Sequence, residues 1–218
     1  MALRKIVTSE DPSLYKRCRE VTKFDDRFHQ LLDDMRDTLE SADGVGLAAP
    51  QVGVLRRAVL VLETNVPENE RPYVIELVNP EIVERSGEQY GPEGCLSVPG
   101  RFGLVTRPME VTVRAQDRYG KSFEVKGEGL TARCLCHEID HLEGVVFTSV
   151  AERMLTDEEL ETGSWMEDED GEEESERASA SCLWERRTLP RPRSKRCWMR
   201  ISRSRRCSLS LISRATGA

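Results

Sequence analysis

Five consecutive residues, His137-Glu138-Ile139-Asp140-His141, form the strongest chemical pattern in the chain. If this segment is helical, His137 and His141 lie four residues apart and share one face of the helix. Both imidazoles can then bind one metal ion, and Glu138 lies beside them as a base for a water that the metal activates. The chain has only three histidines, and the pattern uses two of them. The alternative is a chance occurrence of the motif on an exposed helix.

A catalytic metal site needs a third protein ligand and an open coordination position. In one metalloprotease pattern this ligand is a histidine six residues after the second, but Phe147 occupies that position. Glu161, about twenty residues after the motif, fits another pattern but stands among several acids, where a glutamate is expected anyway. Cys95 stands between glycine and proline residues, and its thiolate would complete a mixed sulfur and nitrogen site. The residues alone leave both open; Cys134, three residues before the motif, is more simply a packed or pocket-lining thiol.

A second segment, Gly44–Gln51 (GVGLAAPQ), is rich in small residues. Small residues let a substrate backbone approach closely, and the Gln51 amide can donate a hydrogen bond to a developing oxyanion. The same segment could be an ordinary loop and the start of a strand. It lacks the spacing of a phosphate-binding loop and no lysine follows, which argues against nucleotide binding.

Three segments together, GVGLAAPQ at 44–51, EGCLS at 93–97 and HEIDH at 137–141, resemble the bacterial-type peptide deformylases. The resemblance covers residues 1 to about 160. It implies that the metal is held by Cys95, His137 and His141 and that Glu138 is the general acid and base. It also implies that Gln51 and the backbone N–H of Leu96 stabilise the oxyanion, and that Gly46 contacts the substrate.

The resemblance further implies a hydrolase that removes the formyl group from the N-formylmethionine of new polypeptides and releases formate. Its metal would most often be Fe2+, with Zn2+, Ni2+ or Co2+ as substitutes, whereas the residues alone favour zinc. We expect Val45, Leu96 and Cys134 to line the methionine pocket, although each could equally belong to the ordinary core. The expected partners are formylated nascent chains and, transiently, the ribosome. We expect a monomer in a bacterial-type cytoplasm, without DNA or membrane partners.

The hydrophobic pattern predicts the elements that would position these residues. Three- and four-residue spacing predicts helices over 24–39 and 130–142, and Thr156 would cap a third helix over 156–161. Short apolar runs predict strands, and the sequence DRYGK predicts a hairpin turn. The strands are expected at 58–62, 73–78, 82–83, 109–114 and 122–125, and the turn at 117–121. This order indicates an α+β fold of short antiparallel strands around the central metal-binding helix, with an N-terminal helix.

Composition divides the chain into three parts. We expect a catalytic domain over 1–165, an acidic disordered linker over 166–176, and an Arg/Ser-rich, disordered tail over 177–218. Residues 1–176 have a net charge of −18 and residues 177–218 one of +11, so the total of −7 describes neither part. An odd number of cysteines, seven, and no secretory signal favour a reducing compartment. No apolar run is long enough to span a bilayer.

The basic tail has two interpretations. Its arginines could bind RNA phosphates, so that the chain would be a non-catalytic RNA-binding protein. Alternatively, the tail is the product of a frameshift. Read one base out of frame, residues 184–190 can encode Gly-Thr-Pro-Asp-Phe-Ala, which resembles the start of methionyl-tRNA formyltransferase. A second segment, 206–214, resembles the same enzyme in the same frame, so we favour the frameshift.

Overall fold

The computed structural model describes residues 3–67 and 69–162. The chain divides into two units, Met1–Met154 and Leu155–Ala218. In the second unit, helix α3 (Asp157–Thr162) begins as predicted. The Thr156 N–H donates to Glu159 Oε2 (2.7 Å), and the Glu159 N–H donates to Thr156 Oγ1 (3.3 Å). The predicted boundary at residue 165, the acidic linker and the basic tail all lie outside the described residues.

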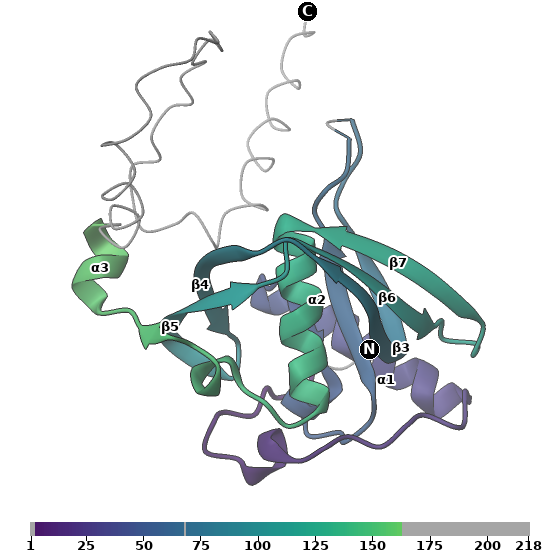
Figure 1. The fold of residues 1–218 in the computed structure, drawn as a ribbon. Coiled ribbons are helices and arrows are strands. Elements are labelled where there is room, and N and C mark those ends of the chain that lie inside the picture. Colours follow the sequence, from purple (N-terminus) through teal and green to yellow (C-terminus); the bar gives the residue numbers. More distant parts are fainter. Residues whose placement is uncertain (1–2, 68, 163–218) are drawn as a thin grey trace, which may run out of the picture. The chain divides into compact units, whose positions relative to one another are not determined.

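The first unit has two main helices and eight strands among its described residues (Figure 1). The helices are α1 (Asp26–Ala42) and α2 (Gly129–Leu142), and three short 3₁₀ helices are η1 (Pro12–Tyr15), η2 (Ala49–Val52) and η3 (Phe147–Ser149). The strands are β1 (Gly46–Ala48), β2 (Ala58–Glu63), β3 (Tyr73–Ser86), β4 (Gln89–Cys95), β5 (Val98–Arg107), β6 (Glu110–Gln116), β7 (Ser122–Glu128) and β8 (Arg153–Met154). No described helix is long and apolar enough to cross a membrane.

The strands form two antiparallel sheets. One has the order β1-β2-β3-β6-β7, and the other the order β4-β5-β8. All pairings within them are antiparallel. The predicted α+β class with antiparallel strands around a helix is therefore confirmed, although β3, with 14 residues, is longer than the short strands we expected.

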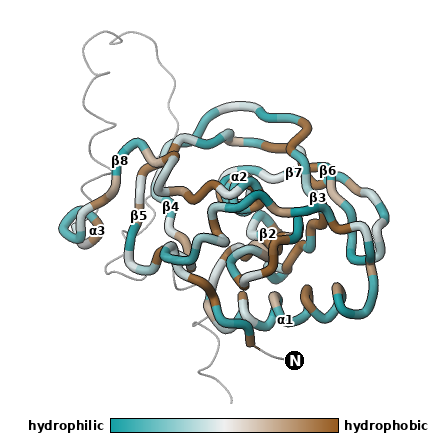
Figure 2. Tube along the Cα trace, turned by 90° about the horizontal axis from the view of Figure 1, so that it is seen from below, coloured by the Kyte–Doolittle hydropathy of each residue, from teal (hydrophilic) through white to brown (hydrophobic). Residues whose placement is uncertain are grey.

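Strand β2 is buried on both faces, which explains its continuous apolar sequence. Val59 and Val61 pack in the same cluster as α2, whereas Ala58 and Leu60 pack in the same cluster as α1. Since successive side chains of a strand point to opposite faces, the two helices cover opposite faces of the sheet at β2. Figure 2 shows the hydrophobic residues of β2 between α1 and α2. This packing holds α2 against the sheet.

Helix α1 and the turn between β6 and β7 form as predicted. Asp25 caps α1 by accepting a hydrogen bond from the Phe28 N–H (3.0 Å). In the turn, the Gly120 N–H donates to the Asp117 carbonyl (3.0 Å), and Gly120 has a φ of 83°. Such a φ favours glycine because it has no Cβ.

The two strands predicted at 73–78 and 82–83 are one strand, β3. Register shifts interrupt its pairing with β6 after Val78 and after Ile82. Asn79 has a positive φ of 50°, and Pro80 follows it. The sequence pattern therefore predicted two strands where the structure has one irregular strand. Asn79 is held there because its amide donates to the Val21 carbonyl (2.9 Å) and accepts from the Val21 N–H (2.8 Å).

Candidate metal centre

Helix α2 carries both histidines of the motif, and most of its side chains are buried in the first unit. It contacts β1, β2, β6 and β7 of the five-stranded sheet and β5 of the hairpin that β4 and β5 form (Figure 1). His137 and His141 point to the same side of the helix, with ring centroids 5.0 Å apart. The predicted helix over 130–142 is confirmed, and so is the shared face of the two imidazoles. Phe147, in the position of a third histidine, stacks on His137 at 6.0 Å instead.

Cys95 reaches the histidines from the end of β4. The pairing of β4 with β5 shifts between Gly94 and Cys95, where the hairpin turns. A Cβ on Gly94 would lie 2.6 Å from the Phe102 ring, so a larger residue here would displace that side chain. The turn brings Cys95 Sγ to 3.2 Å from His141 Nε2.

The donor atoms of Cys95, His137 and His141 all lie within 4.8 Å of one another. A soft thiolate with two imidazoles is a donor set that fits a divalent transition metal ion and leaves one tetrahedral position for substrate or water. The arrangement favours Cys95 over Glu161 as the third ligand; the Glu161 side chain lies outside the described residues. Sequence spacing alone could not make this choice because the three residues meet only in the folded chain.

A buried carboxylate orients His137. Glu93 Oε2 lies 3.0 Å from His137 Nδ1, which leaves the other ring nitrogen for a metal. Arg107 binds the same carboxylate through Nε (2.8 Å) and Nη2 (3.1 Å). A carboxylate behind a ligating histidine fixes the ring and raises its basicity.

These neighbours also shift the pKa values of the site. Burial acts to raise the pKa of Glu93, but hydrogen bonds from His137 and Arg107 outweigh it and hold that pKa at about 2. Burial alone would lower the pKa of His137, but hydrogen bonds with Cys95 and Glu93 raise it well above its usual value. Without a metal, the His137 imidazole thus holds a proton between Cys95 and Glu93. A metal ion that binds this imidazole and Cys95 would take the place of a proton, so metal binding here should release a proton.

Glu138 lies beside the ligands and is 3% exposed. Burial raises the pKa of its carboxyl to about 7, although the charge of His137 opposes the shift. Its Oε2 has no hydrogen-bond partner within the described part of the chain. The carboxyl therefore has a free oxygen and a pKa suited to proton transfer near neutral pH.

Gln51 lies in η2 with its amide fixed at both ends. Its Oε1 accepts from the Ala48 N–H (2.8 Å), and its Nε2 lies 3.3 Å from Cys95 Sγ and 3.4 Å from Ser97 Oγ. The Gln51 Oε1 acceptor is thus occupied by a backbone N–H, and the Nε2 donor faces the candidate metal ligand Cys95. This geometry suits the predicted role of Gln51 as a hydrogen-bond donor to an oxyanion.

Two of the residues expected to meet the substrate, Gly46 and Cys134, lie close to Glu138. A Cβ on Gly46 would meet the Glu138 carboxylate and would lie 2.6 Å from Cys134 Sγ, so β1 and α2 touch at this point. Cys134 Sγ donates to the Val45 carbonyl (3.3 Å). The Leu96 side chain instead packs in the cluster of α1 and lies close to Gly44.

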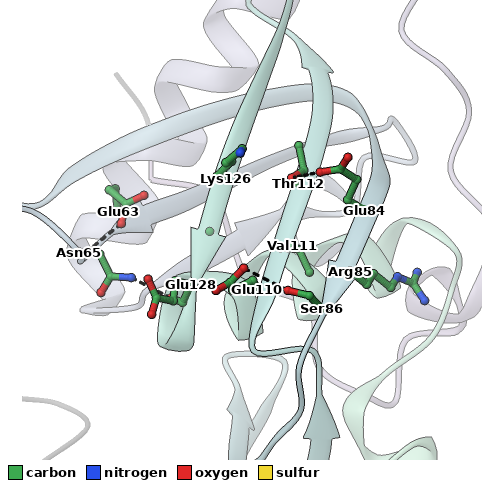
Figure 3. Close-up of a pocket in the computed structure, with 11 residues that line it drawn as sticks. Glu63, Asn65, Glu84, Arg85, Ser86, Glu110, Val111, Thr112, Lys126 and Glu128 are labelled. Carbon is green, nitrogen blue, oxygen red and sulfur yellow. Dashed lines mark hydrogen bonds between the residues drawn. The ribbon is translucent and has the colours of Figure 1, made fainter.

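A pocket of about 620 Å³ lies elsewhere, over β3, β6 and β7 and beyond the end of β2 (Figure 3). None of the candidate metal ligands lines it. Three of its four carboxylates accept hydrogen bonds: Glu63 from the Asn65 N–H (2.8 Å), Glu84 from Thr112 (3.0 Å) and Glu110 from Ser86 (3.0 Å). We interpret it as a polar hollow of the sheet surface that plays no part in the chemistry of the metal centre.

The fold and the site define an α+β metal-dependent hydrolase whose candidate ligands are one cysteine and the two histidines of an HExxH helix. More specifically, residues 3–156 match the family of the polypeptide deformylases, and the chain belongs to this family. The chain is 53% identical to the peptide deformylase of Caldicellulosiruptor bescii over 161 residues. This matched segment covers 74% of this chain and 93% of that protein.

Solved structures agree with this assignment. The crystal structure of a peptide deformylase from Legionella pneumophila has 47% sequence identity and a TM-score of 0.64, covering 69% of this chain and 87% of that one. The structure of the Thermotoga maritima peptide deformylase has 35% identity and a TM-score of 0.65, covering 70% of this chain and 99% of that one. The family resemblance read from three short motifs is therefore confirmed over the whole first unit.

Proposed function

We propose that this chain removes the N-formyl group from the N-terminal formylmethionine of newly synthesised polypeptides and releases formate. Membership of the polypeptide deformylase family supports the activity. The observation that carries the proposal is the convergence of Cys95, His137 and His141, with Glu138 directly after His137 on α2. A site of one thiolate and two imidazoles leaves a position at which an amide carbonyl can be polarised.

Cys95, His137 and His141 would hold the metal. We propose Fe2+, with Zn2+, Ni2+ or Co2+ as functional substitutes, because the donor set suits all four ions. When bound, such an ion polarises a carbonyl oxygen and activates water as a nucleophile.

Glu138 moves the proton in this proposal. Its carboxylate accepts a proton from the attacking water and delivers it to the nitrogen of the leaving amine. A pKa of about 7 suits both transfers, because the group can hold the proton and release it at the same pH.

Gln51 and the backbone N–H of Leu96 would stabilise the negative charge that develops on the formyl oxygen. The Gln51 Nε2 group already faces the site, since its Oε1 is fixed by the Ala48 N–H. One such donor typically contributes about 3–4 kcal/mol to stabilisation of the transition state. Gly46 would let the substrate backbone approach, and Val45 and Cys134 would border the methionine side chain.

We further propose a monomer in the cytoplasm that meets formylated nascent chains and associates transiently with the ribosome. No DNA or membrane partner belongs to this proposal. The catalytic unit is proposed to be residues 1–165, with the linker 166–176 and the tail 177–218 dispensable for the chemistry.

The decisive experiment is anaerobic purification of the full chain, metal analysis, and an assay with a formyl-methionyl peptide. We expect one divalent ion per chain and release of formate. Cys95→Ala should lose both the ion and the activity, whereas Cys18→Ala, which changes a buried thiol outside the candidate ligand set, should keep both. A Cys95→Ala protein that keeps its metal and its activity would refute the ligand set and favour Glu161.

A further inference from the structure

Arg133 is a buried cation on α2 that none of the roles above uses. It is 6% exposed and lies four residues before His137, on the same face of the helix. Its Nη1 donates to the carbonyls of Gly91 (3.2 Å) and Val105 (2.9 Å), and its Nη2 to the carbonyl of Gln89 (3.1 Å). Gly91 and Val105 are paired across β4 and β5. One guanidinium therefore joins α2 to both strands of the hairpin that ends in the candidate thiolate ligand.

The same guanidinium reaches the carboxylate behind His137. Arg133 Nη1 lies 3.1 Å from Glu93 Oε1, an oxygen that also accepts from Arg107 Nε. The other oxygen, Oε2, takes Arg107 Nη2 and His137 Nδ1. Arg107 also binds Asp140 (2.6 Å), so two cations and two carboxylates balance one another here. Glu93 is thus held by two guanidinium groups while it orients a metal ligand.

We propose that Arg133 is a positioning residue for the metal centre. It fixes the hairpin that carries Cys95 against the helix that carries both histidines, and it fixes the carboxylate that orients His137. The inference rests on the proposed function only in requiring that a metal binds at this site. Arg107 cannot replace it: Arg107 holds Glu93, but the three hairpin carbonyls are bound by Arg133.

The contacts require arginine rather than any cation. The acceptors lie on two strands, and the planar fork of a guanidinium presents donors on separate nitrogens to them. A lysine would keep the charge near Glu93 but would offer all its donors from one nitrogen. We therefore expect Arg133→Lys to retain part of the positioning and Arg133→Met to lose it.

The test uses the full chain loaded with Co2+, whose absorption spectrum reports the thiolate bond and the ligand geometry. Arg133→Met should lose Co2+ to a chelator roughly 10- to 100-fold faster than the unchanged protein, because groups behind metal ligands typically affect affinity by this factor. Its thiolate-to-cobalt band should also shift or weaken. Arg133→Lys should fall between the two proteins in both measurements.

Two matched variants separate positioning from general stability. Leu104→Ala removes a buried side chain from β5, the strand that supplies one of the Arg133 acceptors, and Arg114→Met removes an arginine that is over half exposed. Both should release Co2+ at the unchanged rate, although Leu104→Ala should lower Tm. The inference fails if Leu104→Ala, at an equal loss of Tm, releases Co2+ as fast as Arg133→Met.

It also fails if Arg133→Met releases Co2+ within about twofold of the unchanged protein, well below the expected range. If Arg133→Met does not fold, Arg133→Lys decides: release and spectrum identical to the unchanged protein would overturn the inference. Failure of the proposed function is a separate result. It would appear as a Co2+-loaded, unchanged protein that does not deformylate a formyl-methionyl peptide, and the comparison of release rates would still stand.

Discussion

Among single residues, Glu138 and Asp140 show how neighbours decide the role of a carboxylate. Both lie on the same turn of α2, but Arg107 binds Asp140, whereas Glu138 Oε2 has no partner in the described part of the chain. Burial raises the pKa of Glu138 to about 7. Asp140 is thus committed to an ion pair, and Glu138 is free to exchange a proton with a substrate.

Glu138→Gln tests this division. The amide keeps the size of the side chain but cannot transfer a proton, so we expect kcat to fall roughly 10²- to 10⁴-fold. Metal content should stay unchanged because Glu138 is not among the candidate ligands. Glu124→Gln, on the exposed face of β7, is the control and should change neither quantity. A Glu138→Gln enzyme with a near-normal kcat would mean that another group moves the proton.

The sequence predicted some residues of the site better than others. His137, Glu138 and His141 follow from helical spacing, which is a local property. Without the family resemblance, Cys95 could not be chosen over Glu161, because its approach to the histidines depends on a turn between two strands. Arg133 was missed entirely. Its spacing of four residues from His137 was visible, but the carbonyls that bury its charge belong to a distant hairpin.

Between elements, the contact of β1 with α2 leaves no room for a side chain at Gly46. In Gly46→Ala the new methyl group would meet Cys134 Sγ and the Glu138 carboxylate. Overpacking of this kind typically costs about 1–3 kcal/mol of stability. We expect a lower Tm together with a loss of activity, because Glu138 must move.

Adding Cys134→Ala separates the two effects. Removal of the sulfur should restore part of the Tm of Gly46→Ala, but not its kcat, because the clash with Glu138 remains. Cys134→Ala alone serves as the control for the loss of the thiol. If the double variant regained full activity, the close contact with Glu138 would not matter for catalysis.

The elements themselves were predictable where their pattern is periodic. Helices α1 and α2 and strand β2 have clear apolar spacing and formed as expected. Strands β4 and β5 were missed since their sequences, QYGPEGC and VPGRFGLVTR, contain glycine and proline that usually mark loops. They become strands because they pair with each other, and β4 ends at the metal ligand.

An ion-pair cluster joins α1, β3 and the turn between β6 and β7. Glu76 Oε1 lies 2.5 Å from Arg36 and 2.6 Å from Arg118. Burial acts to raise the pKa of Glu76, but hydrogen bonds from Arg118 and Arg36 outweigh it and lower that pKa. A carboxyl whose pKa is lower in the folded than in the unfolded chain stabilises the fold above its unfolded pKa, about 4.3, and loses this effect as the pH falls further.

Glu76→Gln should therefore reduce the free energy of unfolding by roughly 1.5–3 kcal/mol at pH 7. The difference from the unchanged protein should shrink as the pH drops below about 4. Glu124→Gln is the matched control, because its pair with Arg114 is more than half exposed and should contribute under about 1 kcal/mol. Urea unfolding at several pH values measures both, and a pH-independent difference would contradict the ion-pair explanation.

For the whole chain, the segments after residue 165 carry 12 basic and 9 acidic residues but supply none of the candidate site residues. A protein ending at residue 165 should keep the kcat and the metal content of the full chain. Loss of deformylation on truncation would instead place part of the function in the tail. Sequencing the source DNA tests the frameshift: an intact frame through Glu176 with no formyltransferase frame beneath would refute it.

The site also has a mechanical consequence. Cys95 and His141 are 46 positions apart, so an ion held by both is a reversible cross-link between the β4–β5 hairpin and α2. An ion that binds only the folded chain stabilises it by about 4 kcal/mol at 1,000 times its Kd. Chelation should lower the Tm of the unchanged protein but not that of Cys95→Ala. Metal supply would then govern how long each molecule survives in the cell as well as how fast it works.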